Sequence, residues 1–204
     1  MLDVDRHTLD LATSGLLGSA NPEALRSAVS DSDHGVNLLV QQVRRELVVH
    51  ASVRGSHADM PAVLATMSII KDIERIGDYA KQLLRLARVR GPFAPDTAEH
   101  VELTAYSNRI AGHLSDVRGA LATHDGPAAT ALIIDLQALT DDLHTAVHQL
   151  LVADLGVSDG AAQALSYHYL ARIAAHLSNI LTSIVMPLDK LDYYDGSHAT
   201  TGSP

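Results

Sequence analysis

A long amphipathic stretch between residues 66 and 87 is the feature that most constrains how this chain can fold. On a helix of about 3.6 residues per turn, its small and aliphatic side chains fall on one arc and most charged side chains fall outside it. The arc consists of Thr66, Ile69, Ile70, Ile73, Ile76, Gly77, Ala80, Leu83, Leu84 and Ala87. An apolar arc of this length must be covered by neighbouring elements, so the sequence predicts a long helix over about 60–88 inside a helical bundle.

Two acidic residues, Glu74 and Asp78, lie four positions apart at the rim of this arc. The spacing stacks their carboxylates on one side of the helix, where they can share a divalent cation, because hard cations prefer oxygen ligands. Gly77 lies beside them on the apolar side and would let a neighbouring helix approach closely. The alternative is a solvated charged rim, in which Lys71 and Lys81 form ion pairs with the two acids. Spacing alone leaves both interpretations open.

The residues from Asp72 to Lys81 read Asp-Ile-Glu-Arg-Ile-Gly-Asp-Tyr-Ala-Lys, which resembles the signature of the PhoU family of bacterial phosphate-uptake regulators. The resemblance is most specific over residues 60–87. It implies an all-α fold of two tandem three-helix bundles, whose acidic motifs bind metal ions, here through Glu74 and Asp78. Oxygen ligands alone would favour Mg, Mn or Ca, whereas a nearby histidine would favour Zn or Fe.

The same resemblance implies a function. A member of this family would be a non-enzymatic regulator of phosphate uptake and phosphate-starvation signalling, acting on a phosphate transporter and its partner sensor kinase. Such regulators commonly form homodimers and work on the cytoplasmic side, peripheral to the inner membrane. Two alternatives stay open: a metal-binding or storage protein, and a cytoplasmic regulatory subunit of another ion transporter.

Composition narrows the class of protein further. Hydrophobic residues make up 47% of the chain but aromatic residues only 3%, which suits helix–helix packing better than a sandwich of sheets. A formal net charge of −9 argues against a nucleic-acid-binding protein, which needs a basic face. No cysteine, no signal peptide and no apolar run of about 20 residues are present, so we expect a soluble cytoplasmic protein. Nucleotide-binding and hydrolase motifs are also missing, and we expect no enzymatic activity.

Proline and glycine residues divide the chain into two halves. The strongest punctuation is the run Gly-Pro-Phe-Ala-Pro at 91–95, which we interpret as the boundary between a first bundle at 1–90 and a second at 96–192. A disordered tail is expected at 196–204. Hydrophobic spacing and turn residues predict three helices in each half, at 3–17, 22–53, 60–88, 96–123, 128–155 and 161–191.

The two halves carry an internal repeat. Shifting 69–87 by 97 residues places it on 166–184, with Arg75 over Arg172 and Ile76 over Ile173. In the second copy Ala171 and Ala175 stand where the family keeps its acidic pair, so this site is lost or rebuilt around His168, His176 and Asn179. Loss is the preferred interpretation, because alanine side chains ligate nothing. His144 and His148 are a further pair at metal-binding spacing, although two histidines at the rim of an amphipathic helix explain it as well.

Overall fold

The computed structural model describes residues 1–53, 59–152 and 157–194, and all regular structure in these ranges is helical. Six α-helices are present, followed by a short 3-10 helix, which confirms the predicted all-α fold. The helices are α1 (Leu2–Leu16), α2 (Arg26–Val53), α3 (Met60–Arg90), α4 (Ala98–Thr123), α5 (Gly126–Val152) and α6 (Val157–Val185), and the 3-10 helix η1 covers Leu188–Lys190. The predicted tail at 196–204 lies outside the described residues.

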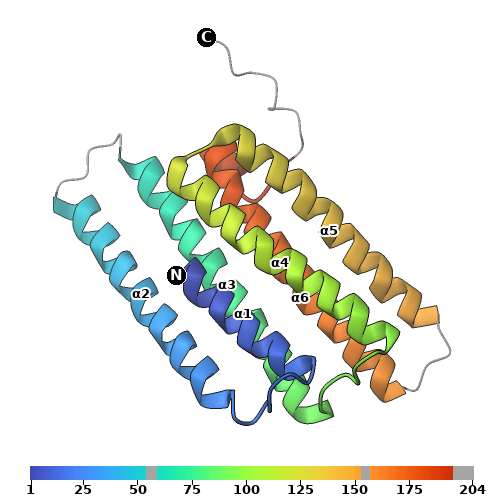
Figure 1. Cartoon of the computed structure of the whole chain (residues 1–204). Coiled ribbons are helices and arrows are strands. Elements are labelled where there is room, and N and C mark those ends of the chain that lie inside the picture. Colours follow the sequence, from blue (N-terminus) through green and yellow to red (C-terminus); the bar gives the residue numbers. More distant parts are fainter. Residues whose placement is uncertain (54–58, 153–156, 195–204) are drawn as a thin grey trace.

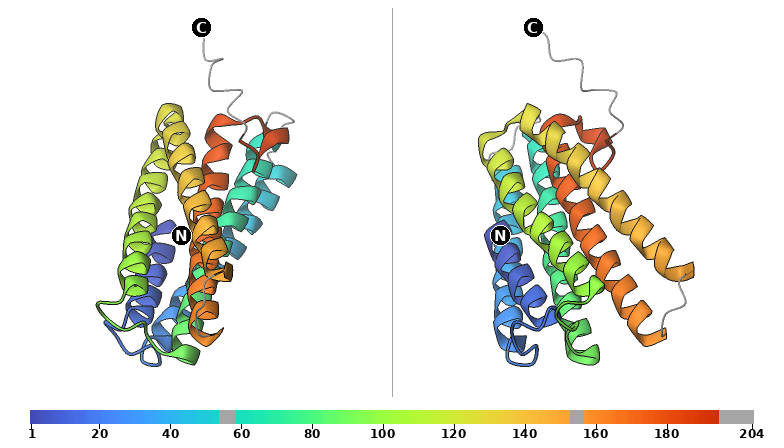
Figure 2. Two further views of the ribbon diagram at one scale, coloured as in Figure 1. Left: turned by 90° about the vertical axis from the view of Figure 1, so that its right-hand side faces the viewer. Right: turned by 45° about the vertical axis from the view of Figure 1, so that its right-hand side comes forward.

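The helices form two groups of three that lie side by side in an elongated molecule (Figure 1). The first group is α1, α2 and α3, and the second is α4, α5 and α6. Helix α3 packs against both α1 and α2 and also against α6, while α6 packs against α4, α5 and α3. The views in Figure 2 show α1 next to α4, which makes a second contact between the groups. Helices α3 and α6 therefore form the centre of the molecule.

One continuous aliphatic core runs through both groups. Of the arc predicted on α3, every member from Ile70 to Ala87 is buried, while Thr66 and Ile69 near its start are half-buried. Helix α6 contributes Ile173, Leu177 and Ile180, each with no exposed surface. Full burial of each large aliphatic side chain contributes about 1.5–3 kcal/mol to folding. Because this core is shared, the division into domains at 91–95 remains a prediction.

The loop between α3 and α4 is anchored to the end of α1. Gly91 ends α3 with a φ of 88°, a conformation that favours glycine. The only phenylalanine, Phe93, is buried, and its backbone N–H donates to the carbonyl of Leu16 at 2.9 Å. The guanidinium of Arg90 lies 3.9 Å from the centre of the Phe93 ring. The segment 91–95, predicted as a boundary between two bundles, is thus a loop that packs against the end of α1.

Three predicted helix ends were wrong by four to six residues, one of them the start of α6, which is Val157 instead of residue 161. Helix α2 begins at Arg26 instead of residue 22, because the side chain of Asn21 accepts a hydrogen bond from the Glu23 N–H and holds a separate turn before the helix. Helix α6 ends at Val185 instead of residue 191, two residues before Pro187. Proline disfavours the helical conformation of the residue before it, and here the chain continues into η1.

Candidate functional site

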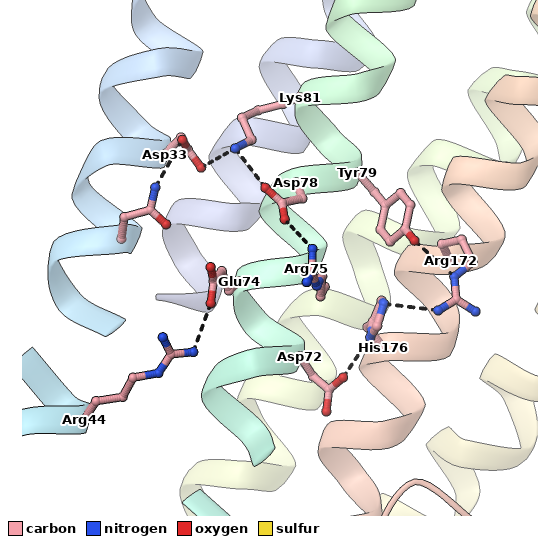
Figure 3. A network of polar contacts seen from close by, with 11 residues as sticks. Asp33, Arg44, Asp72, Glu74, Arg75, Asp78, Tyr79, Lys81, Arg172 and His176 are labelled. Carbon is pink, nitrogen blue, oxygen red and sulfur yellow. Dashed lines mark hydrogen bonds and ion pairs between the residues drawn. The ribbon is translucent and has the colours of Figure 1, made fainter. Parts of the chain in front are cut away.

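The acidic pair predicted to bind metal lies on α3, facing α2, and both members are engaged in ion pairs (Figure 3). The carboxylate of Glu74 accepts from the guanidinium of Arg44 on α2 at 3.1 Å. Asp78 accepts from Arg75 at 3.2 Å and lies 2.9 Å from the ammonium of Lys81. These side chains are partly exposed, so the pairs contribute little to stability, about 0–1 kcal/mol each.

Lys81 joins the acidic motif of α3 to the neighbouring helix α2. Its ammonium donates to Asp33 at 2.6 Å and also pairs with Asp78, so one cation bridges two carboxylates. Burial alone would lower the pKa of Lys81, but the hydrogen bonds to Asp33 and Asp78 raise it above its usual value. Lys81 is therefore charged under all physiological conditions.

A fourth carboxylate approaches this place from α1 and was missed in the sequence. Asp5 has no exposed surface, and neither of its oxygens has a hydrogen-bond partner among the described residues. A Cβ atom at Gly77 would lie 2.9 Å from Asp5 Oδ1, so glycine at this position of the motif makes room for the Asp5 carboxyl. Burial raises the pKa of Asp5 to about 8, and the charges of Asp33 and Asp78 add to this effect, whereas the amino terminus opposes it.

Carboxylate oxygens such as those of Asp33 and Asp78 are suitable ligands for a hard divalent cation. In this structure, however, they are arranged around the ammonium of Lys81. Within the described ranges, no three histidine, aspartate or glutamate side chains are grouped so that they could hold a metal ion. The ammonium of Lys81 lies between Asp33 and Asp78, so a metal ion bound to both would have to displace it. The unpaired Asp5 carboxyl is the observation that favours such an exchange. Metal binding by Glu74 and Asp78 therefore stays a prediction.

A second buried carboxylate, Asp72, connects the two halves of the molecule. Its Oδ1 lies 2.8 Å from Nδ1 of His176 on α6, and both side chains are more than nine-tenths buried. On the other side of His176, Arg172 contacts its Nε2 at 3.4 Å and donates to the hydroxyl of Tyr79 at 3.3 Å. Figure 3 shows this chain of contacts crossing from α3 to α6.

The sequence carried a signal for both buried acids. Asp72 lies three residues after Ile69 and four before Ile76, on the buried side of α3. Asp5 interrupts the row Leu2, Leu9, Ala12 and Leu16, whose spacing of three and four residues marks the buried side of α1. An acid at such a position is unusual, because burying an unpaired carboxylate is costly.

The three residues suggested for a rebuilt second site have different surroundings. His176 belongs to the contact with Asp72, and Asn179 lines a groove between α5 and α6. His168 is exposed beside the ring of Tyr169, and burial together with the charge of Arg172 lowers its pKa. Ala171 is fully buried and Ala175 lines the same groove as Asn179.

The match to a family model lies in the first half of the chain. The family model described as "PhoU domain" matches residues 1–87, a range that includes the motif on α3 and the buried Asp5 of α1. Residues 1–87 are thus similar to a PhoU domain. A relative from Synechocystis, the "Phosphate-specific transport system accessory protein PhoU homolog", is 23% identical over 159 residues, which cover 74% of this chain and 69% of that protein.

The fold extends this likeness beyond the PhoU domain match. The crystal structure of PhoU from Pseudomonas aeruginosa matches with a TM-score of 0.79 and covers 91% of this chain and 90% of that one. Its sequence identity is 19%, so the match concerns the fold. Both groups of three helices therefore have counterparts in a PhoU structure, including the second group, which lies outside the matched family range.

Proposed function

We propose that this chain is a non-enzymatic regulator of phosphate uptake. The observation that carries the proposal is the match of the PhoU domain model to residues 1–87, with the motif around Gly77 and the carboxyl of Asp5 packed against that glycine. The printed name of the Synechocystis relative, an accessory protein of a phosphate-specific transport system, supports the same role. The carboxylates of Glu74 and Asp78 on α3 are both held in ion pairs, and no nucleophile–base pair is among the contacts described above.

The mode of action that we infer is that of an adaptor. It would contact a phosphate transporter on the cytoplasmic side and the partner sensor kinase, and would reduce starvation signalling when phosphate is plentiful. Such an adaptor needs two states with different affinities for its partners. Among the described helices, none is long and apolar enough to cross a membrane, so in this proposal the protein reaches the transporter from the membrane surface.

The proposal is tested by removing the gene in the source organism and measuring a phosphate-starvation reporter together with phosphate uptake. We expect the reporter to become active in phosphate-rich medium and to be silenced again by a plasmid copy. A Gly77→Asp copy is the informative variant, because its side chain would collide with Asp5. A Gly112→Asp copy is the matched control, since no atom from outside its own helix turn lies within 4 Å of a Cβ there.

Each alternative predicts a different outcome of the same experiment. An unchanged reporter with altered uptake of another ion would replace the phosphate role by the regulation of a different transporter. An unchanged reporter with altered metal tolerance would indicate metal storage. Co-purification of the transporter's cytoplasmic subunit with the tagged protein would support the adaptor mechanism, and its absence after crosslinking would contradict it.

A further inference from the structure

A polar groove in the second half of the molecule is separate from the acidic motif on α3. It has a volume of about 360 Å³ and lies between α5, α6 and the segment that follows η1. Helix α5 contributes Gln137 and Asp141, and α6 contributes Ala175, Ser178 and Asn179. The volume lies at the lower end of the range of about 300–1,000 Å³ that small-molecule sites occupy.

The groove lies at the place where the internal repeat loses its second acid. Ala175 aligns with Asp78 of the first copy, and its methyl group forms part of the wall. On α3, the longer Asp78 side chain and its partner Lys81 extend toward α2. On α6, the shorter alanine leaves space between the helices. In the second copy of the motif, the position of the second carboxylate is thus occupied by an alanine that lines a groove.

Some polar side chains of the groove have no hydrogen-bond partner among the described residues, although Thr182 does. Ser166, Thr182 and Ser183 turn their hydroxyls back onto carbonyl oxygens of α6, as serine and threonine in helices usually do. Within the described part of the chain, the hydroxyl of Ser178 makes no such bond, although only 8% of this residue is exposed. The side-chain amides of Gln137 and Asn179 likewise have no partner among the described residues. A hydroxyl that lines a groove, on a residue that is otherwise buried, is available for a hydrogen bond to a ligand.

The charges at the groove select a cation. Asp141 of α5 and Asp192 of the C-terminal segment both line it, and none of the described lining residues is lysine, arginine or histidine. The nearest ion-pair partner of Asp192 is Lys71 at 3.9 Å, with half of that lysine side chain exposed. Burial raises the pKa of Asp192, and the nearby charge of Asp72 adds to the rise, while Lys71 and His176 oppose it. A phosphate or carboxylate ligand would be repelled here.

The donors and acceptors favour an organic ammonium over a metal ion. The described residues include no group of three histidine, aspartate or glutamate side chains that could hold a metal. Serine and amide oxygens accept hydrogen bonds from an N–H donor, and two carboxylates from different segments, Asp141 of α5 and Asp192 after η1, match a ligand with two positive charges. We propose that this groove binds a small aliphatic diamine or polyamine. The inference goes beyond the proposed function and does not depend on it.

Calorimetric titration of the full chain with putrescine and spermidine, in low salt with EDTA, tests the proposal. Asp141→Asn should weaken binding about fivefold, because one partly exposed charge pair is worth up to about 1 kcal/mol. Asp142→Asn is the matched control: this neighbouring acid pairs with Arg109 of α4 at 3.5 Å and does not line the groove. We expect it to bind like the parent.

A second variant, Ala175→Leu, fills the groove and should abolish binding while helix content and the melting temperature stay close to those of the parent. Equal affinities of the Asp141→Asn and Asp142→Asn proteins would overturn the proposal, as would the absence of heat with either amine at millimolar concentration. A parallel titration with MgCl2 without EDTA separates the classes of ligand. Magnesium binding that requires Asp141, without amine binding, would also overturn it.

Discussion

At the scale of single residues, the molecule is unusual in burying two carboxylates, Asp5 and Asp72, in different ways. Asp72 has a histidine partner, whereas both oxygens of Asp5 have none among the described residues. The pKa of Asp5, raised by burial to about 8, means that its carboxyl is protonated in the folded protein over much of the physiological range. The bound proton neutralises the Asp5 carboxyl, which has no partner of opposite charge. The free energy of unfolding therefore depends on pH.

The first prediction concerns this sensitivity. In the unfolded chain Asp5 titrates near 3.8, so between about pH 4 and pH 8 the folded state holds a proton that the unfolded state has released. The contribution of Asp5 to the free energy of unfolding is therefore most favourable below pH 4, and it decreases as the pH rises toward 8. Asp5→Asn should therefore stabilise the protein at pH 8 by about 2–5 kcal/mol relative to its effect at pH 4. Urea unfolding in EDTA at both pH values measures this, and a pH-independent difference would contradict it.

The second prediction concerns metal binding at the motif. Lys81 competes with any cation for Asp33 and Asp78, so the parent should bind Mg²⁺ or Mn²⁺ weakly. Lys81→Met should raise the affinity at least severalfold, because it frees two carboxylates. Glu74→Gln combined with Asp78→Asn should abolish binding and leave helix content unchanged. If this double variant binds metal like the parent in calorimetry, the acidic pair is only a salt-bridged surface.

At the scale of secondary-structure elements, Gly77 of α3 is a place of close contact with α1. A Cβ atom at Gly77 would come within 2.9 Å of Asp5 Oδ1, closer than such atoms approach in folded proteins. Helix α1 is also the shortest of the six, with 15 residues against 31 in α3. The motif glycine thus makes room for the one buried carboxyl that α1 brings to α3.

The third prediction follows from that contact. Gly77→Ala should destabilise the protein by about 1–3 kcal/mol, because the added methyl overpacks a site closed by a side chain of α1. Gly112→Ala, in the middle of α4 with open space around it, should stabilise by about 0.5–1 kcal/mol through helix propensity. Melting temperatures that move in the same direction for both variants would contradict this account.

The elements themselves could be read from the sequence, whereas the partners of the polar side chains could not. The apolar arc of α3 was predictable because a spacing of three and four residues specifies the buried side of a helix. Which helix covers that side depends on packing between distant segments. The spacing of Glu74 and Asp78 therefore suggested a metal site, while Lys81 and Arg44 reach them only because α2 lies alongside α3. His176 could not be paired with Asp72, 104 residues away.

At the scale of the whole molecule, exposed apolar side chains on α2 support the predicted homodimer. Leu38, Val48 and Val49 are each more than half exposed, whereas the large aliphatic side chains of the core are buried, many of them completely. We expect light scattering at micromolar concentration to give the mass of a dimer. Val49→Lys should shift the mass toward that of a monomer if α2 forms the contact, and a monomeric parent protein would contradict the prediction.

The contact between Asp72 and His176 gives the last prediction, because it joins the two groups of helices through their central members, α3 and α6. Removing one partner leaves the other buried without compensation, so Asp72→Leu or His176→Leu alone should cost about 3–5 kcal/mol. The double variant replaces the pair by apolar side chains in the aliphatic core and should recover most of that loss. Arg44→Gln, which breaks an exposed pair of the same motif, should cost no more than about 1 kcal/mol.

Urea denaturation of the four variants measures the coupling energy between the two residues. Losses that simply add would mean that Asp72 and His176 do not act as a pair. A strong coupling has a consequence for the proposed adaptor, since any change of state that rotates one group of helices against the other must first break this contact. In that case the double variant should retain the fold and respond differently to phosphate in the reporter experiment, which a purely structural role of the pair would not produce.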